Sequence, residues 1–152
     1  MATPISFCSL QFANLFLGAH RWIDNWTNAS DGEKKAALIN STQVIIQFCK
    51  FFDDEKNEIH YIPESEDDAN IPDWLRQATC YEALYFLDLE NDPARPFPLG
   101  ILGIIKDGKT TFDHAYEPPL FSAMARQILE NNGAIVDDPY FHGNYWGMRE
   151  WV

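Results

Sequence analysis

Residues 30–52, SDGEKKAALINSTQVIIQFCKFF, predict a helix by every local rule. Ser30 and Glu33 have the Ser-x-x-Glu spacing of a capping box, in which each side chain accepts a hydrogen bond from an amide of the first turn. Apolar and small side chains then recur at helical spacing, which predicts one inward face made of Leu38, Thr42, Ile45, Cys49 and Phe52.

Two further helices are predicted on either side of this one. Ser9 is placed as the N-cap of a helix over residues 9–22, followed by an exit loop at residues 25–29. Pro72 and Asp73 open a helix that runs to about residue 89, with apolar stripes wide enough to imply contacts on two sides. The predicted inward stripe of the first helix is Phe12, Phe16, Ala19, Ile23 and Trp26, and Leu15 and Trp22 widen it.

The later part of the chain predicts a hairpin and a fourth helix. Asp107-Gly108 favours a tight turn between two extended runs, which places a β-hairpin at about residues 101–116. Pro118-Pro119 begins the fourth helix and Gly133 ends it. Its predicted inward residues are Leu120, Phe121, Met124, Ala125, Ile128 and Leu129. The expected fold is mainly α: a small bundle of about four helices with a short hairpin, over residues 1–133.

Residues 134–152 are expected to form an extended C-terminal arm with no helical or strand period. Aromatic side chains are enriched at protein interfaces, so one interpretation is that the arm docks on a partner or a neighbouring subunit. The other interpretation is a tail wrapped over its own core. The candidate partner-binding residues are Pro139, Tyr140, Phe141, Tyr145, Trp146 and Trp151.

The charge balance is strongly acidic, with 11 Lys and Arg against 23 Asp and Glu and a formal net charge of −12. This balance disfavours a basic nucleic-acid-binding patch. Nine of the acidic residues lie between Asp53 and Asp73, in a predicted irregular connection that is a possible contact surface. The cluster Asp53, Asp54, Glu55 and Glu58 lacks the spacing of a cation-binding loop and is interpreted as a solvated helix end.

No catalytic arrangement stands out, and we expect neither an enzyme nor a bound cofactor or metal. His20 and Asp24 are four residues apart, but a structural histidine is the favoured interpretation. Cys8, Cys49 and Cys80 are predicted to be free and buried. With no export signal and no apolar run of membrane-span length, folding in a cytoplasm is expected.

Several strings resemble the head-to-tail adaptor proteins of tailed bacteriophages, also called connector or head-completion proteins, some of which are labelled DnaT-like. Residues 9–22 are similar to that family's opening helix and residues 30–42 to its second. Ile71-Pro72 with the helix that follows resembles the family's Ile-Pro helix, and residues 61–63 correspond to an aromatic-x-Pro piece before it. Residues 103–116 occupy the place of its short extended segment.

The resemblance covers about residues 5–130; the acidic insert at residues 64–70 and the arm depart from it. It implies a virion protein that forms a ring, usually of twelve copies, beneath the portal. The implied partners are the portal protein, neighbouring copies and the next tail-side neck or tail protein, while DNA passes through the channel without specific binding. The alternative is a phage single-stranded DNA-binding or replication-associated factor, for which stacking aromatics are present but a basic groove is not.

Overall fold

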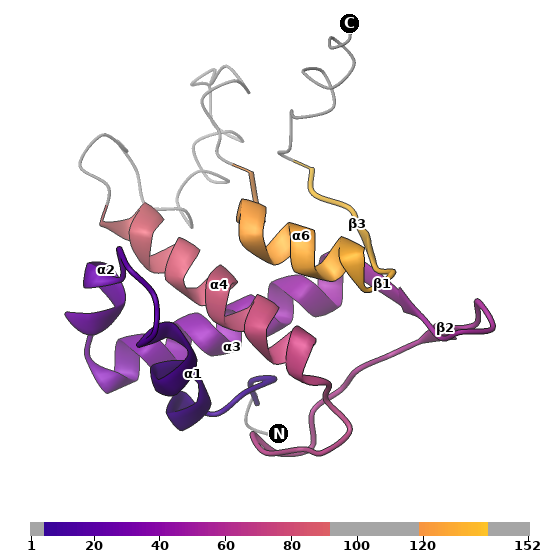
Figure 1. Ribbon diagram of the computed structural model, residues 1–152, viewed down its shortest axis with the longest axis horizontal. Coiled ribbons are helices and arrows are strands. Elements are labelled where there is room, and N and C mark those ends of the chain that lie inside the picture. Colours follow the sequence, from indigo (N-terminus) through magenta and orange to yellow (C-terminus); the bar gives the residue numbers. More distant parts are fainter. Residues whose placement is uncertain (1–4, 92–118, 140–152) are drawn as a thin grey trace, which may run out of the picture.

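The computed structural model describes residues 5–91 and 119–139, which form a helical bundle with a small three-stranded sheet at one end (Figure 1). The mainly helical class is confirmed. The elements, in chain order, are α1 (Leu10–Leu17), α2 (Asp24–Thr27), α3 (Asp31–Phe48), β1 (Cys49–Phe52), β2 (Glu58–Ile59), α4 (Asp73–Glu90), α6 (Ala123–Asn131) and β3 (Ile135–Val136). The hairpin predicted at residues 101–116 lies outside the described residues.

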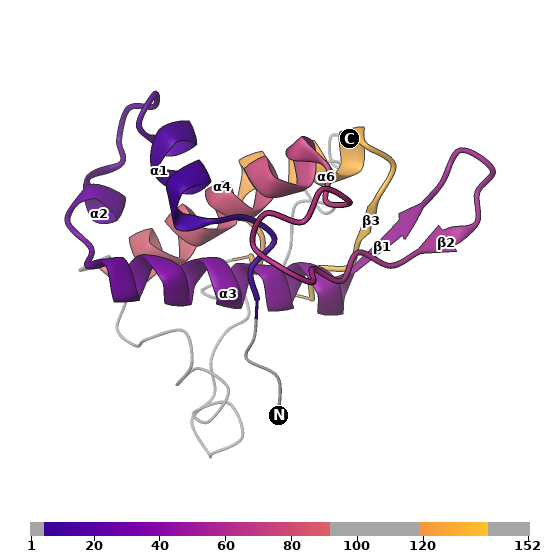
Figure 2. The same cartoon turned by 90° about the horizontal axis from the view of Figure 1, so that it is seen from below.

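Helix α4 is the element that the others cover. It contacts α1, α2, α3 and α6, and Figure 2 shows α3 running beneath it on one side. Its buried residues belong to two apolar clusters, one shared with α6 and the sheet and the other shared with α1 and α2. The predicted contacts on two sides of this helix are therefore confirmed, and its bounds agree with the prediction to about one residue.

Helix α3 begins as predicted and ends earlier than predicted. The Ser30 hydroxyl accepts a hydrogen bond from the Glu33 amide at 3.1 Å, and the Glu33 carboxylate accepts one from the Ser30 amide at 2.9 Å. Leu38, Thr42 and Ile45 are buried along the helix. Cys49 and Phe52 were expected to continue this helical face, but they belong to β1, because the chain becomes extended at Cys49 and pairs with other strands.

The sheet has the order β2-β1-β3, and both of its pairs are antiparallel. Phe51 lies opposite Ile59 in one pair, and Cys49 lies opposite Val136 in the other. The connection after residue 53 is thus partly regular, because it contains a two-residue strand. Residues 134–136, which were assigned to the C-terminal arm, pack on the bundle: Ala134 is buried and β3 is hydrogen-bonded to β1.

The first predicted helix is two helices with a turn between them. The Ser9 cap is confirmed, since its hydroxyl accepts from the Phe12 amide at 3.1 Å, but α1 ends at Leu17. Tight turn hydrogen bonds follow at once, including His20 amide to Leu17 carbonyl at 2.9 Å, and Trp22 then takes a left-handed φ of 63°. Because the helix stops here, Ala19 and Trp22 are exposed, and Leu15 is exposed as well, so all three were wrongly predicted to face inward. The expected exit loop at residues 25–29 instead contains most of α2.

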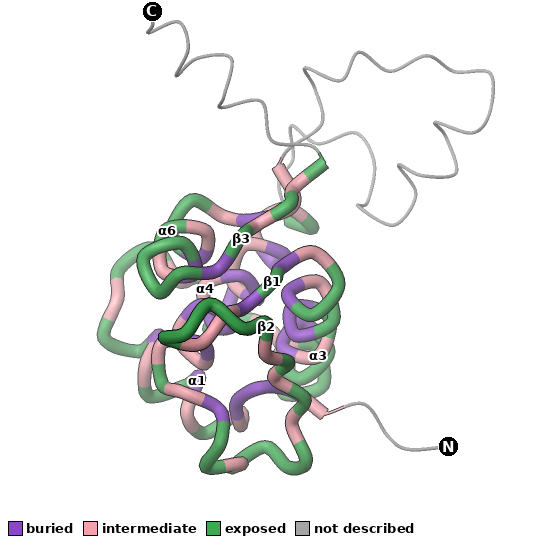
Figure 3. The backbone as a smooth tube through the Cα atoms, turned by 90° about the vertical axis from the view of Figure 1, so that its right-hand side faces the viewer, coloured by how far each residue is buried: buried purple, intermediate pink, exposed green. Residues whose placement is uncertain are grey.

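Helix α6 is shorter than the fourth predicted helix, and Ser122 rather than a proline caps it. Ala125 and Leu129 are buried as predicted, whereas Met124 was wrongly predicted to face inward and is 48% exposed. Gly133 ends the turn after the helix with a φ of 87°, a conformation that glycine adopts without steric cost. Figure 3 shows the buried residues gathered where α3, α4 and α6 face one another.

Within residues 5–91 and 119–139, no helix combines the length and the apolar character that crossing a bilayer requires.

Candidate functional site: the anchor of the C-terminal segment

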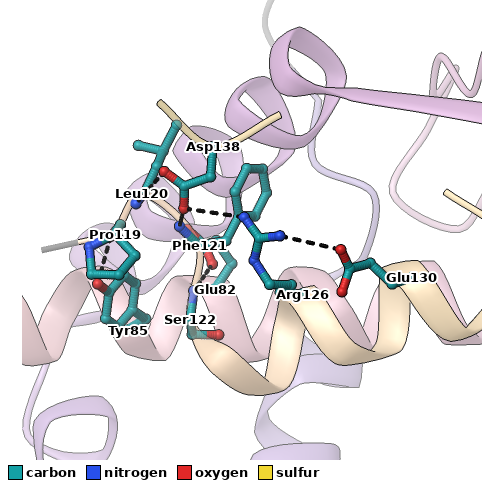
Figure 4. A network of polar contacts seen from close by, with 9 residues as sticks. All are labelled: Glu82, Tyr85, Pro119, Leu120, Phe121, Ser122, Arg126, Glu130 and Asp138. Carbon is teal, nitrogen blue, oxygen red and sulfur yellow. Dashed lines mark hydrogen bonds and ion pairs between the residues drawn. The ribbon is translucent and has the colours of Figure 1, made fainter. Parts of the chain in front are cut away.

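Of the six candidate partner-binding residues, only Pro139 is among the described residues, and it is exposed. Tyr140, Phe141, Tyr145, Trp146 and Trp151 lie outside them. The structure does describe residues 134–139, which directly precede these aromatics in the sequence. The end of this stretch is held by polar groups from three separate segments, which we call the exit latch: the side chains of Glu82, Tyr85, Arg126 and Asp138 and the amide of Ser122 (Figure 4).

Asp138 is the centre of the exit latch. Its two carboxylate oxygens accept hydrogen bonds from the amides of Leu120 and Phe121, at 3.0 and 2.8 Å. The Arg126 guanidinium lies 3.8 Å from the same carboxylate and 3.2 Å from Glu130. The Asp138 side chain is fully buried, so its charge is stabilised by these donors rather than by water. The residue before Pro139 is therefore fixed to the segment that leads into α6.

Glu82 joins α4 to the same corner. Its Oε1 accepts a hydrogen bond from the Ser122 amide at 2.9 Å, while its buried Oε2 has no hydrogen-bond partner among the described residues. Burial raises the pKa of this carboxyl to about 8, and the nearby Asp138 carboxylate adds to the rise, against the lowering effect of the Ser122 amide. At neutral pH the side chain is consequently a neutral acid, which suits a core position.

Tyr85 completes the anchor one turn further along α4. Its hydroxyl donates a hydrogen bond to the Pro119 carbonyl at 2.5 Å. Pro119 and Pro139 are the two ends of the described segment that contains α6 and β3. These two ends lie at the same corner of the bundle, because Leu120 is hydrogen-bonded to Asp138.

The exit latch was not among the residues singled out from the sequence. One signal for it exists: Glu82 stands in the helical register of buried Ala78, Thr79 and Phe86, so it is a carboxyl placed on an inward face. Asp138 carries no comparable signal, because its function as an amide acceptor depends on residues 17 and 18 positions earlier.

His20 has the structural role that was favoured for it. Its Nδ1 lies 2.9 Å from the Phe16 carbonyl oxygen, so this nitrogen donates, and its Nε2 lies 2.7 Å from the Tyr81 hydroxyl. Its ring also packs at 4.9 Å from Phe16. Both nitrogens therefore contact groups of the bundle itself, and the hydrogen bonds tie the turn after α1 to α4.

The acidic cluster that begins at Asp53 forms a turn between β1 and β2 rather than a helix end. One oxygen of Asp53 accepts hydrogen bonds from the amides of Glu55 and Asn57, at 2.9 and 2.8 Å. No group of three or more potential metal ligands occurs within residues 5–91 and 119–139. The Asp53 carboxylate stabilises the β1–β2 turn through its two hydrogen bonds to backbone amides.

The three cysteines are free and buried, as predicted. The sulfurs of Cys8 and Cys80 lie 3.7 Å apart, and this contact, together with burial, raises the pKa of Cys80. Burial raises the pKa of Cys49 to about 12. Because thiolates are the reactive form, Cys49 and Cys80 are poorly reactive in the folded protein.

Comparison with the models of known protein families, with curated proteins and with solved structures finds no match to this chain.

Proposed function

We propose that this chain is a structural adaptor of a tailed phage, which forms a ring beneath the portal and connects the head to the tail. The observation that carries the proposal is the exit latch: it fixes Asp138, two residues before the aromatic-rich sequence that begins at Tyr140, to the corner of a small acidic bundle. A few buried Trp and Tyr side chains can supply most of the energy of an interface, so an aromatic-rich sequence that follows a fixed residue suits attachment to a larger assembly.

The acidity supports the same proposal. Each copy carries a formal charge of −12, so a ring of twelve copies carries about −144. A channel lined by part of that charge repels the phosphate backbone, which lets DNA pass without binding. The order of elements also follows the resemblance: a capped α3, then α4 opened by Ile71-Pro72, then the final helix α6.

The test of the proposal is quantitative mass spectrometry of purified particles from the source. We expect about one copy of this chain for each portal subunit. Absence from the particles would refute the proposal. Fluorescence polarisation with single-stranded DNA at low salt then examines the replication-factor alternative, for which submicromolar binding is the expected result.

A truncation tests the role of the aromatic segment. Deleting residues 140–152 retains the exit latch and β3, so we expect a folded bundle that fails to enter particles. The matched control deletes residues 134–152, which also removes buried Ala134, β3 and Asp138, and is expected to destabilise the bundle itself. A variant without residues 140–152 that enters particles at the wild-type level would contradict the assigned role of the segment.

A further inference from the structure

Trp22 is the most exposed large apolar side chain of the described residues, at 86% of its surface, and it has a left-handed φ of 63°. This conformation is sterically unfavourable for a bulky L-residue. The preceding residue, Arg21, is also exposed. Trp22 is thus an exposed aromatic residue on strained backbone, next to an exposed cation. Strained backbone and exposed apolar surface are both typical of sites that bind a partner.

The turn that carries Trp22 is firmly held by the bundle. His20 is bonded to the Phe16 carbonyl on one side and to the Tyr81 hydroxyl of α4 on the other. Trp22 is thus presented in a defined position before any partner arrives, which reduces the entropy lost on binding.

A groove of complementary character lies on the other side of the molecule. It has a volume of about 520 Å³ and lies between the β1–β2 turn and the turn from α6 to β3. Phe52 and the 56%-exposed Ile135 supply apolar surface, Asp53 and Asp54 supply two carboxylates, and Lys56 supplies one ammonium group. The groove therefore offers apolar contact for an aromatic ring and negative charge for a cation.

The Arg21–Trp22 pair and the groove lie at opposite ends of the long axis: α1 and α2 are at the left of Figure 1, and β1 and β2 are at the right. We propose that Arg21 and Trp22 of one copy bind the groove at Phe52, Asp54 and Ile135 of the next copy. Two different, complementary surfaces on one chain make a heterologous contact, which builds a ring or a chain of copies rather than a closed pair. The inference rests on the proposed ring and identifies the surfaces that form it.

Charge favours a second copy as the occupant. The groove end carries the β1–β2 turn and β2, where Asp53, Asp54, Glu55 and Glu58 outnumber Lys56, so two groove ends repel each other. The Trp22 end brings Arg21 toward that acidic surface. The aromatic ring supplies the buried anchor and the ion pair sets the orientation.

Directed cross-linking tests the contact in the full chain. Because the native cysteines are buried, the double variant Ala19→Cys, Asn132→Cys keeps Trp22 and Ile135 in place and has two accessible thiols, one beside Trp22 and one at the groove. A short bismaleimide is expected to give a ladder of trimers and larger species at high protein concentration, whereas each single variant is not. The matched control pairs Ala19→Cys with Met124→Cys, an exposed residue outside the groove. A ladder no stronger than that of the control, or no species beyond the monomer, would overturn the proposal.

Two variants separate assembly from folding. Trp22→Gly relieves the strained φ, so the thermal midpoint should be unchanged or higher while self-association weakens about tenfold or more. Arg21→Glu should also weaken self-association, and adding Asp54→Arg in the same chain should restore it. If Trp22→Gly assembles like the wild type, the contact is wrong.

The outcomes also distinguish this contact from the proposed function. If the chain is found in particles but gives no cross-linked ladder, free or in the particle, the adaptor role is supported and the Trp22–groove contact is refuted. If the chain forms the ladder but is absent from particles, the contact is supported and the adaptor role is refuted.

Discussion

The two sides of α4 differ in the polar groups that lie next to their apolar cores. On the side of α1 and α2, the cluster that contains Cys8, Leu17 and Leu87 is apolar, and the hydrogen bond between His20 and Tyr81 links the turn after α1 to α4. On the side of α6, the core borders the Glu82 carboxyl and the Asp138–Arg126 pair. The apolar side only has to pack, whereas the α6 side must also hold the chain where it leaves the bundle. We therefore expect the stability of the α6 side, which carries the buried Glu82 carboxyl, to depend on pH.

The largest expected effect is therefore a pH dependence that originates on the α6 side. The pKa of Glu82 is about 8 in the folded chain and near 4.5 in the unfolded chain, so the folded state binds the extra proton between these values. Its contribution to stability is fully present below pH 4.5 and is lost as the pH rises to 8. The loss approaches about 5 kcal/mol over the whole window.

The Glu82→Gln variant isolates this effect, because glutamine retains an oxygen for the Ser122 amide and does not ionise. Chemical denaturation of both proteins from pH 4.5 to 9 should show the wild type losing stability relative to the variant as the pH rises. Subtracting the two curves cancels the carboxylates common to both. Parallel curves would show that Glu82 is ionised in the folded state and would remove this difference between the two sides.

A cavity on the apolar side should cost as much as a typical core truncation and leave the pH dependence unchanged. Leu17 is fully buried in the cluster with Leu38 and Leu87. Leu17→Ala is expected to lower the free energy of unfolding by about 2–5 kcal/mol, by lost burial and an unfilled volume. The measurement is urea unfolding at pH 5 and pH 8. A different pH dependence from the wild type would mean that the two sides are coupled through α4.

Features that depend on neighbouring residues could be predicted from the sequence, and features that depend on distant residues could not. The caps at Ser9 and Ser30, and the bounds of α4, are local features, and the sequence predicts them well. The end of α3 depends on β1 pairing with β3, about 87 residues further along the chain, and the break after Leu17 depends on Tyr81 of α4. The spacing of apolar residues within one segment gives no information about these distant partners, β3 and Tyr81.

The candidate site shows the same limit more strongly. Aromatic content draws attention to residues 139–151, but it says nothing of how that segment is attached. The attachment is Asp138 bonded to the amides of Leu120 and Phe121, a contact between segments that no periodicity predicts.

Removing the central carboxylate of the exit latch should cost somewhat less than the cavity. Asp138→Ala leaves two amides and the Arg126 guanidinium without this acceptor, with an expected loss of about 2–4 kcal/mol. Asp137→Ala is the matched control, since the exposed neighbour keeps its backbone hydrogen bond to the Phe48 carbonyl at 2.8 Å. The comparison is made by chemical denaturation at pH 6. Equal stability of the two variants would show that Asp138 does not hold the corner.

The smallest and sharpest test removes one hydroxyl from each side. Tyr81 donates to His20 and Tyr85 donates to the Pro119 carbonyl, so Tyr81→Phe and Tyr85→Phe are matched deletions four residues apart on one helix. Each should cost about 1 kcal/mol in the free energy of unfolding. Their local consequences should differ. Tyr81→Phe should speed hydrogen exchange in the turn at residues 18–22, and Tyr85→Phe should speed it at residues 120–122 and 138. Identical exchange patterns in the two variants would mean that α4 responds as a single unit, and the distinction between its two sides would not hold.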